Sequence, residues 1–203
     1  MKLSFFGAAQ EITGSCFLLE SSKSKLLIDC GLFQCPKFCD LRSREPFPFD
    51  PKTIDALFIT HAHIDHTGRI PKLIKEGFCG HIYSTHPTKA LAELMLKDSV
   101  GVLAKEAARE KTDVLYAEAD VDKAMTLWKG KNYREEIRIG DFKVSLRDAG
   151  HVLGSAMIEV NCATSTEIGT GKTILFTGDL GNPFNPLLSG FEQVSGVNYL
   201  LIE

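Results

Sequence analysis

The sequence lacks a long apolar segment and an excess of basic residues. No run approaches the roughly 20 apolar residues that a membrane-spanning helix needs, so we predict no membrane association. The formal net charge is −3, from 23 Lys and Arg against 26 Asp and Glu. Nucleic-acid-binding domains usually carry a basic surface. Any affinity for a nucleic acid must therefore come from local groups of positive charge or from a part of the protein outside these residues.

Cysteine is also sparse. Six cysteines in 203 residues are too few for a disulfide scaffold. Cys30, Cys35 and Cys39 form the one cluster, but their spacing is unusual for zinc and no fourth ligand is adjacent, which favours free thiols. The segment 1–7 has one positive charge and too short an apolar run for a signal peptide. These features predict a cytoplasmic protein.

Histidine is scarce but concentrated. Three of the six histidines fall in residues 60–66, which read THAHIDH and follow an apolar, β-prone run. Alternate side chains of an extended segment share a face, so His61 and His63 can reach one metal ion. Asp65 and His66 follow in the turn and could reach a second ion. A polar loop with histidines by chance is the competing interpretation, and the concentration of ligands disfavours it.

Two other strand ends carry residues that bind metals. His151 follows the alternating strand 142–146, and Asp179 follows the apolar strand 173–176. Each stands beside a glycine, which lets the backbone bend toward an ion. Alone, the histidine would be a surface residue and the aspartate a turn residue. Beside the first cluster, we predict that both join a metal site.

The ligand residues and their flanks resemble the metallo-β-lactamase superfamily. Asp29, the run 61–66, His151 and Asp179 match its first four motifs in order. Longer segments resemble the RNA-processing β-CASP branch, which includes RNase J and the endonuclease of messenger-RNA 3′-end formation. These segments are 7–16, 65–71, 148–156 and 176–181.

The resemblance implies an α/β fold, the αββα sandwich. Residues 1–203 would form one catalytic domain that is incomplete at its C-terminus. In the β-CASP enzymes a helical cap follows the strand that corresponds to 198–203, and the chain then returns to supply a last metal-binding histidine. We therefore expect the N-terminal part of a longer protein. Without the remainder, residues 1–203 should be weakly active or inactive.

Strands and helices alternate in the order that this fold requires, with the ligands on loops at one sheet edge. The expected strands are 2–6, 16–20, 25–29, 56–60, 82–84, 137–139, 142–147, 156–160, 173–177 and 198–202. The expected helices are 70–76, a long stretch opened by Pro87, and 120–129.

Two zinc ions are the expected cofactors, and manganese or iron would also suit the ligand set. The expected metal ligands are His61, His63, Asp65, His66, His151 and Asp179. By resemblance Asp179 bridges the two ions, and it is counted as catalytic together with Asp65. Asp29 is expected to be a buried carboxylate that orients a ligand histidine and fixes its tautomer. Glu203 is expected, by resemblance, to be catalytic and to steer an acid/base histidine.

The expected function is a metal-dependent hydrolase that cleaves RNA phosphodiester bonds through a hydroxide activated by two metals. The expected partners are RNA and either a homo-oligomer or an RNA-processing complex. A thioester or lactone hydrolase similar to glyoxalase II would use the same metal site, but segments 7–16 and 150–156 favour RNA. A non-catalytic scaffold subunit is disfavoured, because every ligand expected before residue 203 is present.

Two further patterns are interpreted as structural. Residues 169–173, GTGKT, resemble the end of a Walker A loop, but Thr166 stands where a glycine is needed and a β-prone run follows. The basic residues within 105–111 alternate with two glutamates. This alternation favours a solvated helix face over a nucleic-acid-binding patch.

Overall fold

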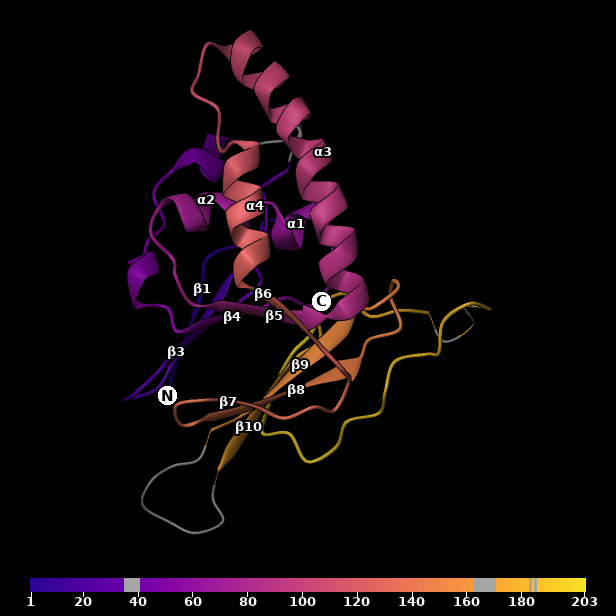
Figure 1. Cartoon of the computed structure of the whole chain (residues 1–203). Helices are drawn as coiled ribbons and strands as arrows, with labels where there is room; N and C mark the ends of the chain where they lie inside the picture. Colours follow the sequence, from indigo (N-terminus) through magenta and orange to yellow (C-terminus); the bar gives the residue numbers. More distant parts are fainter. Residues whose placement is uncertain (35–40, 163–170, 183, 185) are drawn as a thin grey trace.

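The structure is a computed structural model that describes residues 1–34, 41–162, 171–182, 184 and 186–203. Two β-sheets lie face to face, and helices cover the outer face of one of them (Figure 1). This layered arrangement is the α/β sandwich that the sequence predicts.

The first sheet contains six strands of the described chain, in the order β1 (Lys2–Phe5), β2 (Phe17–Glu20), β3 (Lys25–Ile28), β4 (Ala56–Phe58), β5 (His81–Thr85) and β6 (Trp128–Lys131). The strands β1 to β3 are antiparallel neighbours, whereas β3 to β6 run parallel. Parallel strands are usually buried on both faces and therefore apolar throughout. Every residue of β4 is fully buried.

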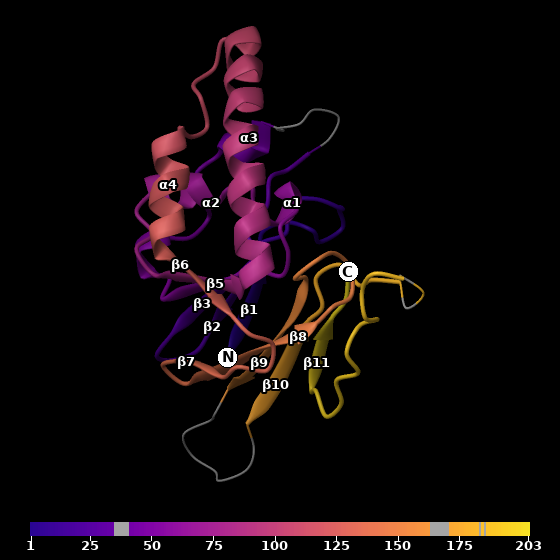
Figure 2. The same cartoon turned by 45° about the vertical axis from the view of Figure 1, so that its right-hand side comes forward.

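The second sheet contains five described strands, in the order β11 (Tyr199–Leu201), β10 (Lys172–Phe176), β9 (Ala156–Cys162), β8 (Phe142–Asp148) and β7 (Ile137–Ile139). The strands β7 to β10 are antiparallel, and β11 runs parallel to β10 (Figure 2). In β8 the buried residues alternate, with Phe142, Val144 and Leu146 facing the first sheet. The apolar residues that predicted this strand alternate with polar ones because only one face of the strand is covered by the first sheet.

Helices pack on the outer face of the first sheet (Figures 1 and 2). These are α1 (Ile64–Thr67), α2 (Ile70–Lys75), α3 (His86–Glu110) and α4 (Glu118–Leu127), with two short 3₁₀ helices, η1 (Leu41–Arg44) and η2 (Pro51–Thr53). Successive residues of β4 pack into two different apolar cores, one between the first sheet and the helices and one between the two sheets. Leu57 packs toward the helices with Leu96, and Phe58 packs toward the second sheet with Ile158. Each such buried side chain contributes about 1.5–3 kcal/mol.

The outer face of the second sheet has a smaller cover. Met157 and Leu175 pack there against Leu180, Val194 and Val197, which belong to an irregular segment. Among the described residues no helix covers this face. The described residues therefore form three layers of the predicted sandwich, namely one helical layer and both sheets.

Most predicted elements, the helix 120–129 among them, are confirmed within one or two residues, and two local assignments differ. The predicted helix 120–129 ends at Leu127, because Trp128 pairs with Ile82 in β6 and its Nε1 donates a hydrogen bond to Ser84 Oγ at 2.8 Å. The predicted turn after the first histidines is instead the one-turn helix α1. In both places the local sequence is compatible with more than one secondary structure, and the tertiary context selects the one observed.

Three smaller predictions concern loops, thiols and the membrane. Lys172 opens strand β10, as expected for a segment that is not a Walker A loop, while residues 166, 169 and 170 lie outside the described residues. Cys30 is a buried free thiol, and Cys35 and Cys39 also lie outside the described residues. Among the described helices, none has both the length and the apolar character that a membrane span requires.

Candidate metal centre

The predicted ligands meet at one edge of the two sheets. His61 and His63 follow β4, and His66 lies in α1 just beyond. His151 follows β8 and Asp179 follows β10, both in the second sheet. The ligand set is thus divided between the sheets and converges where their strands end.

The first group consists of three imidazoles and one carboxylate, from His61, His63, His151 and Asp179. One ligand atom of each lies within 4.8 Å of the others. His61 Nε2 lies 3.0 Å from His63 Nδ1, and Asp179 Oδ2 lies 3.4 Å from His151 Nε2. Zinc is usually bound by such nitrogen and oxygen donors in a compact set. The residues present therefore fit the zinc ion that the sequence predicts.

A second group shares the same aspartate. His66, Asp179 and Glu203 also place one ligand atom each within 4.8 Å of the others. Asp179 Oδ1 lies 3.5 Å from His66 Nε2, while Oδ2 faces His61 Nε2 at 3.8 Å. One carboxylate thus stands between two ligand groups, as expected for a bridging residue.

Two predicted residues have a less direct placement. Asp65 Oδ2 lies 3.9 Å from His66 Nε2, yet Asp65 belongs to neither group. Glu203 Oε2 lies 3.8 Å from His66 Nε2 and accepts a hydrogen bond from Ser15 Oγ at 3.1 Å. The geometry brings both carboxylates to the site, and their separate roles stay predictions.

Asp29 contacts a histidine of the predicted ligand set, and its role in orienting a metal ligand stays a prediction. Its side chain is fully buried, and its Oδ2 lies 2.8 Å from His66 Nδ1. An ionised carboxylate only accepts hydrogen bonds, so the Nδ1 of His66 carries a proton. The Nε2 of the same ring then faces Asp179 and Glu203. A carboxylate that orients a ligand histidine in this way is a common partner of metal sites.

Thr60 contacts two residues of the predicted site, and the sequence did not mark it as a candidate. Its backbone N–H donates to Asp29 Oδ1 at 2.8 Å, and its hydroxyl lies 2.7 Å from Asp29 Oδ2 and 3.1 Å from His61 Nδ1. A hydroxyl has one proton, which goes to the carboxylate. The hydroxyl oxygen therefore accepts from Nδ1–H of His61, leaving Nε2 of that ring free for a metal. Only its place directly before His61 signalled this residue.

Gly178 allows the second sheet to approach this network. Its φ is +52°, and a Cβ there would lie 2.7 Å from the Cβ of Thr60. Any side chain would therefore push the end of β10 away from the end of β4. The glycine that the sequence predicted as a bend toward an ion is required by this contact with Thr60.

The histidines differ in their pKa values. Burial lowers the pKa of His61 to about 2, with help from the charge of His66, and burial also lowers the pKa of His151. Burial alone would lower the pKa of His66, but the nearby Asp29 and Asp179 carboxylates raise it well above its ordinary value. At neutral pH His61 and His151 are therefore neutral donors, whereas the metal-free His66 is protonated.

The carboxylates respond to the same charges. The hydrogen bond with His66 lowers the pKa of Asp179 to about 2. Burial raises the pKa of Glu203 to about 7, and the negative charge of Asp29 adds to that shift. A divalent cation among these groups would replace the proton on His66. Its affinity should therefore rise with pH.

Comparisons with known proteins identify the family. The family profile of the metallo-beta-lactamase superfamily matches residues 10–123, more than half of the chain. The chain belongs to this superfamily. A metallo-β-lactamase of Cronobacter sakazakii has a TM-score of 0.56 at 19% identity, covering 87% of this chain and 57% of that one, which supports the superfamily fold.

Relatives at higher identity lie in the RNA-processing branch of the superfamily, which confirms the predicted resemblance. Ribonuclease TTHA0252 of Thermus thermophilus is 38% identical over 182 residues, covering 90% of this chain and 38% of that protein. Cleavage and polyadenylation specificity factor subunit 3 of Dictyostelium discoideum is 32% identical over 208 residues, covering 100% of this chain and 25% of that protein. This superfamily member thus spans well under half the length of these relatives.

Proposed function

We propose that the protein is a metal-dependent ribonuclease that hydrolyses RNA phosphodiester bonds at the edge where the two sheets meet. The observation that carries this proposal is the pair of ligand groups that share Asp179, with one carboxylate oxygen toward each group. A relative named as a ribonuclease supports the RNA substrate.

The ligands divide between two zinc ions. His61, His63 and His151 would hold one ion, His66 would hold the other with Asp65, and Asp179 would contact both. Two such ions, when bound, lower the pKa of a shared water and stabilise negative charge that develops on a phosphoryl group. Manganese or iron in the same ligands is an alternative that metal analysis decides.

The chain's own contribution is to hold the rings of His61 and His66 in one orientation, with a proton on Nδ1 of each. The Asp29 carboxylate and the Thr60 hydroxyl fix the Nδ1 protons of His66 and His61, so that both rings present Nε2 to the site. Ligands already fixed in this way do not need to reorganise when they bind a metal. Glu203, held by Ser15 Oγ, stands beside His66 as the carboxylate that we expect to orient an acid/base histidine.

The remaining predictions on context belong to the same proposal. Substrate RNA would reach the site at the exposed side of Asp179, whose side chain is 37% exposed, whereas His61 behind it is buried. A subunit of a cleavage and polyadenylation factor is among the relatives, so we propose an RNA-processing complex as the setting. A homo-oligomer and a cytoplasmic location stay predictions from the sequence.

The test is a comparison of substrates and metals. The protein is stripped with a chelator, reloaded with zinc, manganese or iron, and assayed on end-labelled single-stranded RNA and on a thioester. Since residues 1–203 alone are expected to be weakly active at most, we expect a weak cleavage of RNA that disappears with the chelator and returns with metal. Asp179→Asn should abolish cleavage, whereas Asp122→Asn, on the exposed surface of α4, should have no effect. Hydrolysis of the thioester at a higher kcat/KM than that of RNA would overturn the proposal and favour the glyoxalase II-like alternative.

A further inference from the structure

His151 lacks the support that holds the rings of His61 and His66. Nδ1 of His61 faces the Thr60 hydroxyl at 3.1 Å. Nδ1 of His66 faces Asp29 Oδ2 at 2.8 Å. Within the described part of the chain, Nδ1 of His151 has no hydrogen-bond partner, and its Nε2 faces the other ligands. The position of this ring therefore depends on the backbone that carries it.

Residues 149–155, the His151 loop, are closed on themselves by Ser155. The backbone N–H groups of His151 and Val152 both donate to Ser155 Oγ, at 3.0 and 3.2 Å. The backbone N–H of Ser155 donates to the backbone oxygen of Val152 at 2.9 Å. Ser155 is buried. A side-chain hydroxyl that bonds nearby backbone groups in this way stabilises a turn, so the loop has a defined shape of its own.

Three hydroxyl groups from other elements hold the His151 loop from outside. Thr85 Oγ1 and Thr88 Oγ1 both donate to the backbone oxygen of Gly154, at 2.6 and 2.8 Å. Tyr133 OH donates to the backbone oxygen of Ser155 at 2.8 Å. A carbonyl oxygen has two lone pairs, so that of Gly154 can accept both threonine protons. The loop is thus fixed at two successive carbonyl groups.

The two threonines lie where the first sheet meets the helical layer. Thr85 is the last residue of β5 and the N-cap of α3, where its hydroxyl accepts a hydrogen bond from the backbone N–H of Thr88 at 3.3 Å. Both side chains are buried. The first turn of α3 therefore lies against the loop that follows β8 (Figure 2). Strand β5 pairs with β4, whose end leads to His61 and His63, so these hydrogen bonds set the distance between ligands of the two sheets.

Gly154 allows the loop to come this close. Its φ is +84°, and a Cβ there would lie 2.7 Å from Thr85 Oγ1 and 2.8 Å from the backbone nitrogen of Thr88. Any side chain would therefore push the loop away from both threonines. The close contact and the two hydrogen bonds belong to one arrangement.

We propose that Thr85, Thr88 and Tyr133 are positioning residues of the metal centre, which hold the His151 loop so that Nε2 of His151 stays beside the ligands of the first sheet. This inference rests on the metal site of the proposed function. The hydrogen bonds are present without a metal, so His151 has little to reorganise when an ion binds. Groups that fix a ligand in this way typically raise metal affinity.

The test removes hydroxyl groups and keeps the shapes of the side chains. Thr88→Val and Tyr133→Phe are combined in one variant of the whole chain, and zinc affinity is measured by competition with a chelator. We expect the affinity to fall about tenfold or more, as for other groups that orient metal ligands. Thr88→Ser keeps the hydroxyl and should retain wild-type affinity.

A double-mutant cycle shows whether the effect passes through His151. His151→Ala leaves the other ligands of its group in place, so a weaker zinc affinity remains to be measured. In that background Thr88→Val and Tyr133→Phe should lower the affinity no further, because the ring that the loop positions is gone. A merely structural effect would lower the affinity equally in both backgrounds.

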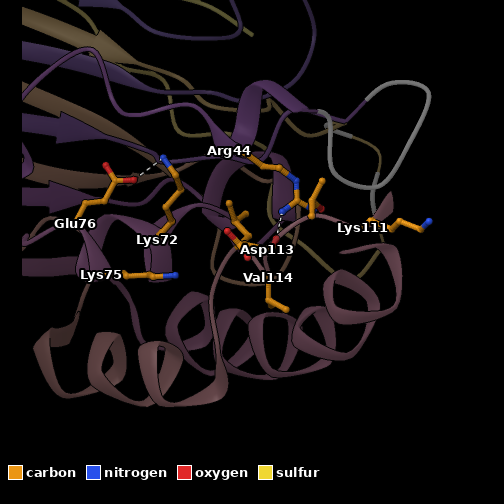
Figure 3. Close-up of a pocket in the computed structure, with 9 residues that line it drawn as sticks. Arg44, Lys72, Lys75, Glu76, Lys111, Asp113 and Val114 are labelled. Carbon is orange, nitrogen blue, oxygen red and sulfur yellow. Dashed lines mark hydrogen bonds and ion pairs between the residues drawn. The ribbon is translucent and has the colours of Figure 1, made fainter. Parts of the chain in front are cut away.

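Two controls separate positioning from general stability. Ser99→Ala removes a buried hydroxyl that bonds Tyr116 further along α3. Glu76→Gln removes an ion pair with Lys72 Nζ, 2.8 Å long, beside a separate cavity of the helical layer (Figure 3). Both variants should retain wild-type zinc affinity, whatever their melting temperatures.

The outcomes that overturn the inference are definite. One is a folded double variant whose loss of zinc affinity is well short of the expected fall. Another is an equal loss with and without His151. If thermal melting shows that the double variant does not fold, both measurements are made with Tyr133→Phe alone, whose ring is partly exposed. That variant should lower zinc affinity only where His151 is present, and any other result would overturn the inference.

Failure of this inference can be distinguished from failure of the proposed function, because zinc affinity is measured without RNA. Zinc binding that depends on Thr88 and Tyr133, in a protein that cleaves no RNA, would overturn the ribonuclease proposal and leave the positioning role standing. Metal-dependent RNA cleavage by a protein whose zinc affinity is insensitive to both residues would do the reverse.

Discussion

Thr60→Val removes one hydroxyl from the centre of the ligand network and keeps the shape of the side chain. In the native protein that hydroxyl donates to Asp29 Oδ2 at 2.7 Å and accepts from His61 Nδ1 at 3.1 Å. The backbone N–H of residue 60 still bonds Asp29 Oδ1 in the variant. The carboxylate therefore stays in place, while the proton on the His61 ring loses its acceptor.

The expected magnitudes follow from these two contacts. A hydrogen bond to a charged group contributes about 1.5–3 kcal/mol, and a buried donor left unsatisfied costs about 1–3 kcal/mol. The Asp29 carboxylate and the His61 ring are both buried, so the two losses together should lower the unfolding free energy of the metal-free variant by about 2.5–6 kcal/mol. Without an acceptor at Nδ1, the His61 ring is free to change tautomer or rotate. Zinc affinity should fall about 10–100-fold, as for other partners of metal ligands.

The assay combines a zinc competition titration with urea unfolding of the chelated protein. Thr60→Ser should retain zinc affinity, because it keeps the hydroxyl. Ser99→Ala is the matched control, since it removes a buried hydroxyl that bonds Tyr116 in the helical layer. That control should lose stability and retain zinc affinity. Zinc binding by Thr60→Val within about threefold of wild type, well short of the expected fall, would refute the reasoning, whatever its stability.

Three further predictions concern the site. Asp65→Ala should keep the fold and lower RNA cleavage on the order of a hundredfold or more; a variant that keeps its zinc and loses less than tenfold in kcat/KM contradicts the assigned role. Burial lowers the pKa of His61 to about 2, so this residue reduces metal-free stability as pH drops below about 6.5, whereas Glu203, whose pKa is raised to about 7, increases it over the same range. Between pH 7 and pH 5 the unfolding free energy of wild type, measured in urea, should therefore fall relative to that of His61→Gln. Zinc at about a hundred times its dissociation constant should raise the unfolding free energy by about 2.7 kcal/mol, and an unchanged melting temperature on chelation would count against metal binding to the native state.

The ligand histidines could be predicted from the sequence because their chemistry is concentrated in a short run. His61, His63 and His66 stand together after one apolar strand, and a β-strand's end is a common place for functional side chains. His151 and Asp179 carried weaker local signals, and they became candidates through the first cluster and the family resemblance. What joins them is the meeting of two sheets, which no local pattern encodes.

The failures have tertiary causes. Trp128 continues the helical spacing of Val121, but its pairing with Ile82 makes it a strand residue. In the sequence Thr60 was interpreted only as the last residue of a strand. Its importance was not visible there, because its two partners, Asp29 and His61, come together only in the folded chain. The basic residues Lys105, Arg109 and Lys111 are exposed, as the alternating charges of this region predict. Nothing in the sequence shows that the segment beyond it returns to Arg44.

The division of the ligands between the sheets has a consequence for motion. The histidines at positions 61, 63 and 66 follow strand β4 of the first sheet, while His151 and Asp179 follow strands of the second. A metal ion bound by ligands from both groups would therefore cross-link the two sheets. The sheets could then separate at this edge only after the ion dissociates. Local opening of a native protein exposes its amides to exchange with solvent. Amide exchange in β4 and β10 should slow together when metal is added, with less change in α3, so the ion would set how long the two halves of the molecule stay closed.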